Sequence, residues 1–206
     1  MKTIVYLIRH SEPMRKKINL INNDSLQVTN EKNPLSIIGE KRAEELSNKE
    51  EMQNIDLVIA SNYVRTISTA KYIAEKNNID IYINEMFGER KHGINSWDEL
   101  PQGFESKQMA DPNFKVGNGE SQNEVANRMY NTLMQVIEEN QGKRIAIVSH
   151  ATAIMFLFMK IGDYQNNRLC FNNQILIDEN FEWNAPEVFK LEIDENNQII
   201  SINNIR

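Results

Sequence analysis

Three short apolar runs that end abruptly in polar or basic residues constrain the fold of this chain most. The run TIVYLI is followed by Arg9 and His10, the run IDLVIA by Ser61 and Asn62, and the run RIAIVS by His150. Runs of this length predict buried strands, and the segments between them have the spacing of amphipathic helices. Because strands and helices alternate, the chain is expected to form βαβ units with a largely parallel sheet.

The predicted elements cover most of the chain. Strands are expected at residues 3–8, 55–60, 79–83 and 144–149, and helices at residues 36–48, 63–76, 121–140 and 152–161. The tail segments NNQILIDEN and EVFKLEIDENNQIISIN predict two or three further strands of the sheet, some of them antiparallel, with the turn ENNQ between the last pair. Residues 88–119 show little periodicity, which indicates an irregular functional loop or lid.

Composition bounds the class of protein. The 206 residues show no shift in composition, so one domain spanning residues 1–206 is expected. The balance of 23 Lys+Arg against 29 Asp+Glu does not favour binding to nucleic acid or to an anionic membrane. No apolar run approaches the roughly 20 residues of a membrane span, and the chain is expected to be cytoplasmic. The oligomeric state stays open, and the single cysteine, Cys170, is expected to be a core residue.

The polar residues at the ends of these runs predict an anion site. Ligands of open parallel sheets bind beyond the carboxyl ends of the strands, so Arg9, His10 and His150 should lie together. Arg65, one turn into the helix after the second strand, should join them. Free N–H groups at helix starts favour an anion, and the guanidinium fork suits phosphate oxygens. The sequence therefore predicts a phosphate pocket.

Six segments resemble the motifs of the histidine phosphatase superfamily, which has the phosphoglycerate mutase-like fold. LIRHSEP resembles the RHGE signature, NPLSIIGEKRAEEL the PLTxxGxxQA segment and ASNYVRTISTA the SPxxRxxxTA segment. GERKHGINSWDE is similar to the ERxxGxWEG loop, GNGESQNEVANR to the GES segment and VSHATAI to the second histidine motif. The six follow one another in the family's order over nearly the whole chain, which is therefore identified by resemblance as a member.

The resemblance implies a three-layer α/β/α sandwich with a mostly parallel sheet. It also implies that His10 attacks phosphorus and becomes a phosphohistidine, while Arg9, Arg65 and His150 hold the phosphoryl oxygens. Glu89 is expected to protonate the leaving oxygen and then to act as the base for water. Phosphoryl transfer of this kind depends on positioning and positive charge, so neither a metal nor a cofactor is expected.

Several positions depart from the family pattern. Ser11 and Ala151 stand where glycine is usual, Ser36 replaces Thr, and Lys16 occupies a position where mutases often carry Asn. These four residues are expected to contribute to substrate binding. Glu12 resembles the carboxylate that follows the signature histidine and is expected to orient its neighbours.

The expected function is that of a phosphomonoesterase acting on a small phosphorylated metabolite. A cofactor-dependent phosphoglycerate mutase is the first alternative, although only about 25 residues separate Gly93 from Gly119, where mutases of this fold usually carry a longer insertion. A non-catalytic binding module is the second, but none of the five catalytic groups is lost. His92 is expected to be a loop residue packed under Trp97, and no HxxxH spacing suggests a metal site.

Overall fold

The computed structural model describes residues 2–15 and 24–205. A six-stranded sheet forms its centre, with the strand order β3-β2-β4-β1-β8-β9. Its strands are β1 (Thr3–Arg9), β2 (Leu57–Ala60), β3 (Ile81–Ile83), β4 (Arg144–Ser149), β8 (Glu187–Ile193) and β9 (Ile199–Asn204). The strands β1 to β4 pair in parallel, whereas β8 is antiparallel to β1 and β9 is antiparallel to β8.

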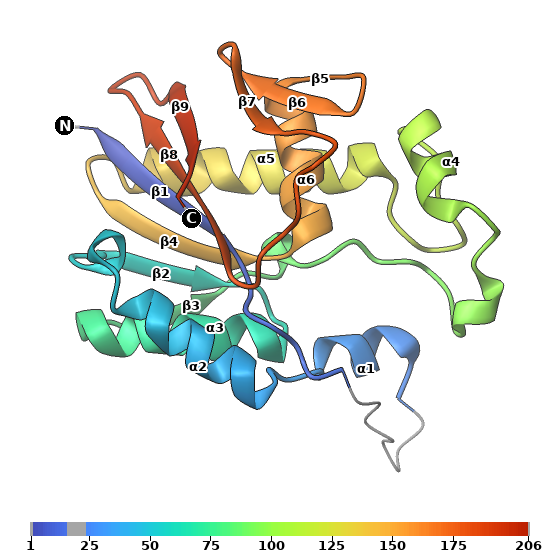
Figure 1. Ribbon diagram of the computed structural model, residues 1–206, viewed down its shortest axis with the longest axis horizontal. Helices are drawn as coiled ribbons and strands as arrows, with labels where there is room; N and C mark the ends of the chain where they lie inside the picture. Colours follow the sequence, from blue (N-terminus) through green and yellow to red (C-terminus); the bar gives the residue numbers. More distant parts are fainter. Residues whose placement is uncertain (1, 16–23, 206) are drawn as a thin grey trace.

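Four helices cover the two faces of this sheet (Figure 1). They are α2 (Ile37–Ser47), α3 (Val64–Asn77), α5 (Gln122–Glu139) and α6 (Ala151–Ile161). Successive side chains of a strand point to opposite faces, and β1 follows this rule. Val5 and Leu7 belong to the core under α5 and α6, while Tyr6 and Ile8 belong to the core under α2 and α3. The expected three-layer α/β/α sandwich is therefore confirmed.

Shorter elements complete the fold. They are the helices α1 (Leu26–Glu31) and α4 (Phe104–Ala110), the single 3-10 turns η1 (Glu50–Met52), η2 (Glu85–Phe87) and η3 (Trp97–Glu99), and the strands β5 (Asp163–Gln165), β6 (Arg168–Phe171) and β7 (Gln174–Ile177). Among the described residues, no helix combines the length and the apolar character that crossing a membrane requires.

The structure differs from the sequence-based expectation in the tail. The segment NNQILIDEN contributes β7, which belongs to a separate three-stranded sheet with β5 and β6 rather than to the central sheet. Two Asn-Asn pairs explain this sheet: residues 166 and 167, and then residues 172 and 173, all have positive φ. Positive φ at both central residues is the signature of a two-residue hairpin turn. The last two strands, β8 and β9, extend the central sheet as expected.

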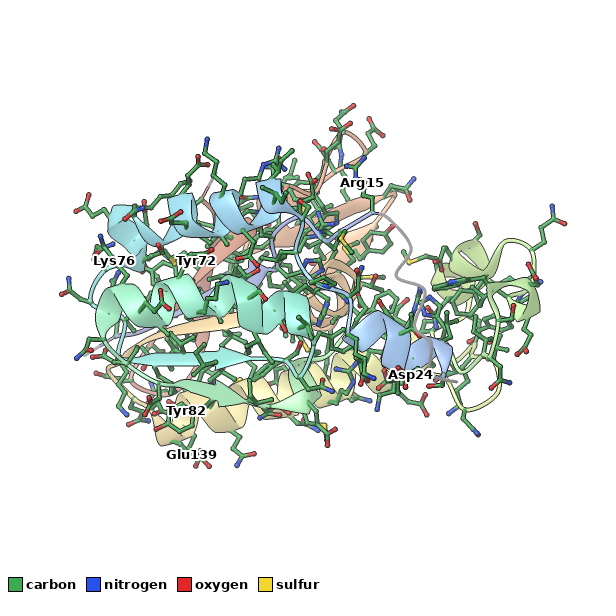
Figure 2. The ribbon with its side chains drawn as sticks, turned by 90° about the horizontal axis from the view of Figure 1, so that it is seen from below. Arg15, Asp24, Tyr72, Lys76, Tyr82 and Glu139 are labelled. Carbon is green, nitrogen blue, oxygen red and sulfur yellow. The ribbon has the colours of Figure 1, made fainter. Side chains whose placement is uncertain are left out.

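Residues 88–119 include the short elements η3 and α4, and the two ends of this segment come into contact at Gly93 and Gly119. A Cβ added at Gly93 would lie 2.0 Å from the amide nitrogen of Gly119, so only glycine allows this approach. Lys91 O also accepts a hydrogen bond from Glu120 N at 2.8 Å. Figures 1 and 2 place this segment and α1 at the same end of the molecule, beyond the carboxyl ends of the parallel strands.

The chain that follows His10 is fixed against the start of α2. Ser36 N donates to Glu12 O at 2.9 Å, and the Ser36 hydroxyl caps α2 by accepting from Gly39 N. A Cβ on Gly39 would lie 2.1 Å from the same Glu12 oxygen, so a side chain there would push α2 away. This contact explains why glycine follows the PLS motif.

Candidate active site

The carboxyl ends of three strands bring the predicted groups together. In the sheet register Arg9 lies beside Ser149, and Ala60 lies beside Val148. The residues that follow these strands, namely His10, Ser61 and His150, therefore leave the sheet at the same level. His10 N donates to Ser149 O at 3.0 Å, and Ser61 N donates to Val148 O at 3.1 Å.

His10 is buried, with 6% of its surface exposed, and both of its ring nitrogens are engaged. Nδ1 lies 2.7 Å from Ser11 O, and Arg65 Nε donates to Nε2 at 3.1 Å. A guanidinium group only donates, so Nε2 must be the unprotonated nitrogen and Nδ1 must carry the proton that Ser11 O accepts. The lone pair of Nε2 therefore faces Arg65.

Burial also keeps this imidazole neutral. Desolvation, followed by the positive charge of Arg65, lowers the pKa of His10 to about 3. A neutral imidazole with an oriented lone pair is a competent nucleophile at neutral pH.

His150 is held by the same arginine. Its Nδ1 lies 3.2 Å from Arg65 Nη2 and accepts, while its Nε2 lies 2.8 Å from the Ser61 hydroxyl and donates. The rings of His10 and His150 have centroids 5.2 Å apart. Complete burial, together with the neighbouring His10 and Arg65, lowers the pKa of His150 well below its usual value. Both histidines are therefore neutral hydrogen-bonding groups.

Arg65 is the centre of these contacts. Besides the two histidines it bonds Asn30 of α1, because Nη1 donates to Asn30 O at 2.6 Å and to Asn30 Oδ1 at 3.3 Å. Its guanidinium carbon lies 4.6 Å from the centroid of the Tyr63 ring. Desolvation lowers the pKa of Arg65, and the Glu89 carboxylate opposes this effect.

Arg9, the last residue of β1, directly precedes His10. Its Nη1 donates to Trp183 O at 3.0 Å and to Asn184 O at 2.8 Å. Because β8 runs antiparallel to β1, Arg9 lies beside Glu187, and the residues just before β8 reach the site. Arg9 Nε is buried and has no hydrogen-bond partner among the described residues. Desolvation lowers the pKa of Arg9, whereas Glu89 and Glu187 raise it.

The start of α6 adds backbone donors. His150 is the N-cap residue, its side chain does not cap the helix, and the first intrahelical bond runs from Ile154 N to His150 O. The amides of Ala151 and Thr152, the first two residues of α6, therefore have no hydrogen-bond acceptor within the helix. Such a helix start favours an anion.

Glu89 stands at the edge of this cluster. Its Oε1 accepts from Arg90 N at 2.9 Å and from Ala153 N at 3.1 Å, the second bond tying it to the start of α6. Arg128 of α5 fixes the backbone around it, since it donates to the carbonyl oxygens of Gly88 and Glu89. Glu120 holds Arg128 in turn through an ion pair at 2.6 Å.

The remaining expected binding residues have structural partners. Ser11 is fully buried and its hydroxyl donates to Gly39 O at 2.7 Å, so its contribution is the carbonyl oxygen that orients His10. The Ser36 hydroxyl caps α2 and donates to Glu12 Oε1 at 3.2 Å. Glu12 also pairs with Arg42, which agrees with an orienting role. Lys16 lies outside the described residues.

Three further sequence-based expectations concern His92, Cys170 and metals. The His92 ring packs against Trp97 with centroids 5.1 Å apart, as expected. Cys170 is only half-buried, because β6 lies in the small outer sheet. The residues that the structure describes contain no group of three or more His, Cys, Asp or Glu side chains able to hold a metal ion.

Sequence reasoning missed Asn30, Tyr63 and Arg128. Tyr63 and Arg128 lie inside segments that match the family motifs, ASNYVR and NEVANR, and adjacency to motif residues was a usable signal. Asn30 had none, because α1 is six residues long, buries no residue and shows no readable periodicity.

Comparison with known proteins agrees with this geometry. The model of the histidine phosphatase superfamily, branch 1, matches residues 5–184. The probable phosphoglycerate mutase GpmB of Escherichia fergusonii is 29% identical over 157 residues, which are 73% of this chain and 70% of that protein. The protein of the same name from Cronobacter sakazakii is 27% identical over 179 residues, covering 82% of this chain and 80% of the relative.

Solved structures share the fold at lower identity. YhfR of Bacillus stearothermophilus has a TM-score of 0.71 at 19% identity and covers 96% of this chain and 95% of its own. The mycobacterial glucosyl-3-phosphoglycerate phosphatase has a TM-score of 0.69 at 15% identity, with coverage of 99% and 97%. A mutant of the phosphoserine phosphatase of Entamoeba histolytica, in complex with phosphoserine, has a TM-score of 0.68 at 18% identity, with coverage of 98% and 96%.

The burial of a neutral His10 predicts how stability depends on pH. In the unfolded chain its imidazole binds a proton near its usual pKa of about 6.5, but in the folded protein it stays neutral down to a pKa of about 3. Unfolding therefore takes up a proton between these values, and His10 stabilises the fold fully above pH 6.5 and progressively less as the pH falls toward 3. The slope for one proton is at most about 1.4 kcal/mol per pH unit.

We expect the His10→Gln variant, which keeps a donor and an acceptor but cannot titrate, to lose this contribution. Urea unfolding between pH 6 and pH 4 should give a free energy of unfolding that falls less steeply for the variant than for the wild type, by up to about 1.4 kcal/mol per pH unit. Equal slopes of the free energy of unfolding against pH for the two proteins would show that His10 has the same pKa in the folded and the unfolded chain.

Proposed function

The chain belongs to the histidine phosphatase superfamily, and we propose that it is a phosphomonoesterase that hydrolyses a small phosphorylated metabolite through a phosphohistidine on His10. The buried His10, whose Nε2 lone pair faces Arg65, carries this proposal, and the Nε of the preceding Arg9 is a buried donor without a hydrogen-bond partner among the described residues. A buried donor without an acceptor costs about 1–3 kcal/mol, and a phosphoryl oxygen would satisfy it. The superfamily and the phosphatases that share the fold support the same reaction class.

In the first step the lone pair of His10 Nε2 attacks phosphorus, and the bond between phosphorus and the alcohol oxygen breaks. The Arg65 Nε–H that now donates to Nε2 turns to a phosphoryl oxygen as the new bond forms. Arg9 Nε and the free amides at the start of α6 are suited to the other oxygens. The carboxyl group of Glu89 gives its proton to the departing alcohol oxygen.

In the second step the Glu89 carboxylate takes a proton from water, the water oxygen attacks phosphorus, and the bond between phosphorus and Nε2 breaks. Inorganic phosphate leaves and His10 is neutral again. The backbone bonds from Arg90 N and Ala153 N hold Oε1 of Glu89, and Oε2 makes no hydrogen bond to a described residue, so this oxygen is suited to the proton transfers.

The proposed enzyme is an acid-type histidine phosphatase that works without a metal ion. Two guanidinium groups, Arg9 and Arg65, supply the positive charge that a metal supplies in other phosphatases. We propose that the enzyme works in the cytoplasm and needs no partner beyond its phosphorylated substrate. It is not expected to bind nucleic acid, since its net charge is −6.

A phosphoglycerate mutase is the second candidate, because the sequence relatives carry that name. A mutase must also bind a bisphosphate and the carboxylate of its substrate. The hollow beside Glu89 is instead lined by the carboxylates of Glu31, Glu85, Glu89 and Glu120 and by the cations Lys91 and Arg128. This negative balance disfavours a multiply charged anion. A non-catalytic module is disfavoured because all five catalytic groups are present at the site.

The first test separates the hydrolase from the mutase. Incubated with 3-phosphoglycerate and a trace of the bisphosphate, the protein should form little 2-phosphoglycerate, and a panel of phosphomonoesters should yield inorganic phosphate from at least one member. His10→Ala should abolish this release, whereas Tyr82→Ala, a change of an exposed residue of β3, should retain it, and exhaustive chelation should not affect it. Rapid isomerisation with little phosphate release would identify a mutase, and loss on chelation that Mg²⁺ restores would exclude the proposed mechanism.

The second test concerns Glu89. General acid catalysis contributes about 10²–10⁴ in rate and matters most for a strongly basic leaving oxygen. Glu89→Gln keeps an oxygen for Arg90 N and Ala153 N but cannot donate the proton in the same way. Single-turnover phosphorylation of His10 should therefore slow far more with an alkyl phosphate than with p-nitrophenyl phosphate, whose leaving group departs unprotonated.

The matched control is Glu85→Gln, which changes a second carboxylate that lines the same hollow. It should affect both substrates little and equally. Equal losses for both substrates in Glu89→Gln would contradict the assignment and move the role of acid to Glu85 or Glu12.

A further inference from the structure

The alcohol part of the substrate must lie next to the groups that hold the phosphoryl group. We infer that it occupies the hollow between α1 and residues 91–97, and that the substrate is a phosphomonoester whose alcohol carries an apolar ring and no second anion. This inference rests on the proposed function and adds the class of substrate to it.

Helix α1 borders the phosphoryl site directly. Asn30 accepts from Arg65 Nη1 through both its main-chain and side-chain oxygens, at 2.6 and 3.3 Å. Gln27 Nε2 donates to the Tyr63 hydroxyl at 2.8 Å, and the Tyr63 ring lies 4.4 Å from the His150 ring, centroid to centroid. A ligand that contacts Asn30 is therefore separated from Arg65 by one residue, and a ligand that contacts Gln27 is separated from His150 by Gln27 and Tyr63.

The hollow next to α1 has the size and lining for a ring. Its volume is about 150 Å³, and an apolar cavity of about 150 Å³ is large enough to hold benzene. Leu26, Ile94 and Trp97 give it an apolar surface, and Trp97 is 53% exposed. The amide side chains of Gln27, Asn30 and Asn118 lie around them. Since α1 buries no residue of its own, a bound ring would provide the apolar surface that the helix lacks.

Charge disfavours a second anionic group on the substrate. Lys91 lines both this hollow and the neighbouring one beside Glu89, where four carboxylates face two cations. One of these cations, Arg128, is already paired with Glu120 at 2.6 Å. A second anionic group that extended past Lys91 from the hollow next to α1 would meet these carboxylates, and like charges placed together lower affinity.

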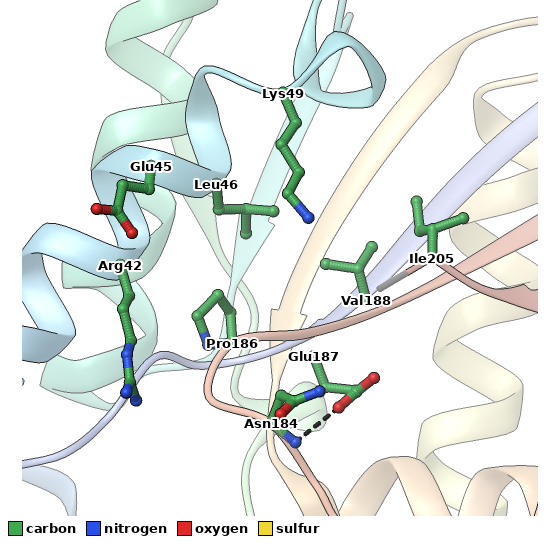
Figure 3. Close-up of a pocket in the computed structure, with 9 residues that line it drawn as sticks. All are labelled: Arg42, Glu45, Leu46, Lys49, Asn184, Pro186, Glu187, Val188 and Ile205. Atoms are coloured by element: carbon green, nitrogen blue, oxygen red, sulfur yellow. Dashed lines mark hydrogen bonds between the residues drawn. The ribbon is translucent and has the colours of Figure 1, made fainter.

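A larger hollow of about 250 Å³ lies between α2 and the start of β8 but does not fit this role (Figure 3). Neither hollow is lined by one of the five catalytic groups, but the hollow next to α1 shares Lys91 with the hollow that Glu89 lines, whereas this larger one shares no residue with it.

The test compares two alkyl esters with similar leaving oxygens, 2-phenylethyl phosphate and ethyl phosphate. The wild type should hydrolyse the phenylethyl ester with a kcat/KM at least about tenfold higher, since apolar contacts in a pocket give discrimination of this size. Trp97→Ala should bring the ratio of the two kcat/KM values close to one. The control Tyr82→Ala changes an exposed aromatic residue of β3 and should keep the wild-type ratio.

Calorimetry with 2-phenylethylphosphonate and ethylphosphonate, which are not hydrolysed, gives a second readout that needs no turnover. The phenylethyl compound should bind the wild type at least about tenfold more tightly, and Trp97→Ala should remove this preference. Equal binding of the two phosphonates, a ratio that Trp97→Ala leaves unchanged, or a kcat/KM for phosphoserine or 3-phosphoglycerate above that of the phenylethyl ester would overturn the inference. Absence of phosphate release from every ester, with the binding preference present, would instead refute the proposed hydrolase.

Discussion

The site depends on one guanidinium group that donates to two buried imidazoles. Arg65 Nε bonds His10 Nε2 at 3.1 Å, and Arg65 Nη2 bonds His150 Nδ1 at 3.2 Å. Because arginine only donates, these bonds decide which nitrogen of each ring is unprotonated, and they are compatible only with neutral rings. These bonds orient the lone pair that attacks in the proposed mechanism, and the charge of Arg65 adds to burial, which is the larger cause of the low pKa of both histidines.

The fold supplies the conditions for that interaction. Parallel pairing of β1, β2 and β4 ends three strands at one level, and the antiparallel β8 brings the carbonyl oxygens of Trp183 and Asn184 to Arg9. Two arginines are thereby held in a poorly hydrated place, which is costly unless an anion joins them. The Glu89 carboxylate opposes part of this charge in the absence of a ligand. A dianionic phosphoryl group would balance both arginines, which leaves Glu89 able to carry the proton that the proposed mechanism needs.

The sequence predicted the centre of the site but not its surroundings. Arg9, His10 and His150 follow strand-like runs, so the geometry of a parallel sheet was enough to predict that they lie together. Arg65 lies within the first turn of α3, the helix that follows β2. Ser11 was expected to bind the substrate, but its hydroxyl donates to Gly39 O. The sequence did not predict this bond, because the close packing of α2 at Gly39 leaves no signal other than the glycine itself. Asn30 was missed for a different reason: α1 is held by hydrogen bonds between Asn30 and Arg65 and between Gln27 and Tyr63, which leave no periodic pattern.

The position of the phosphoryl group on the imidazole tests this account most directly. Wild-type protein quenched in alkali during turnover, digested and sequenced by mass spectrometry should carry phosphate on His10, and NMR of the labelled peptide should place it on Nε2, because Nδ1 is bonded to Ser11 O. Phosphate on Nδ1, on His150, or on no histidine at all would contradict the central claim that Arg65 orients Nε2 of His10 for attack.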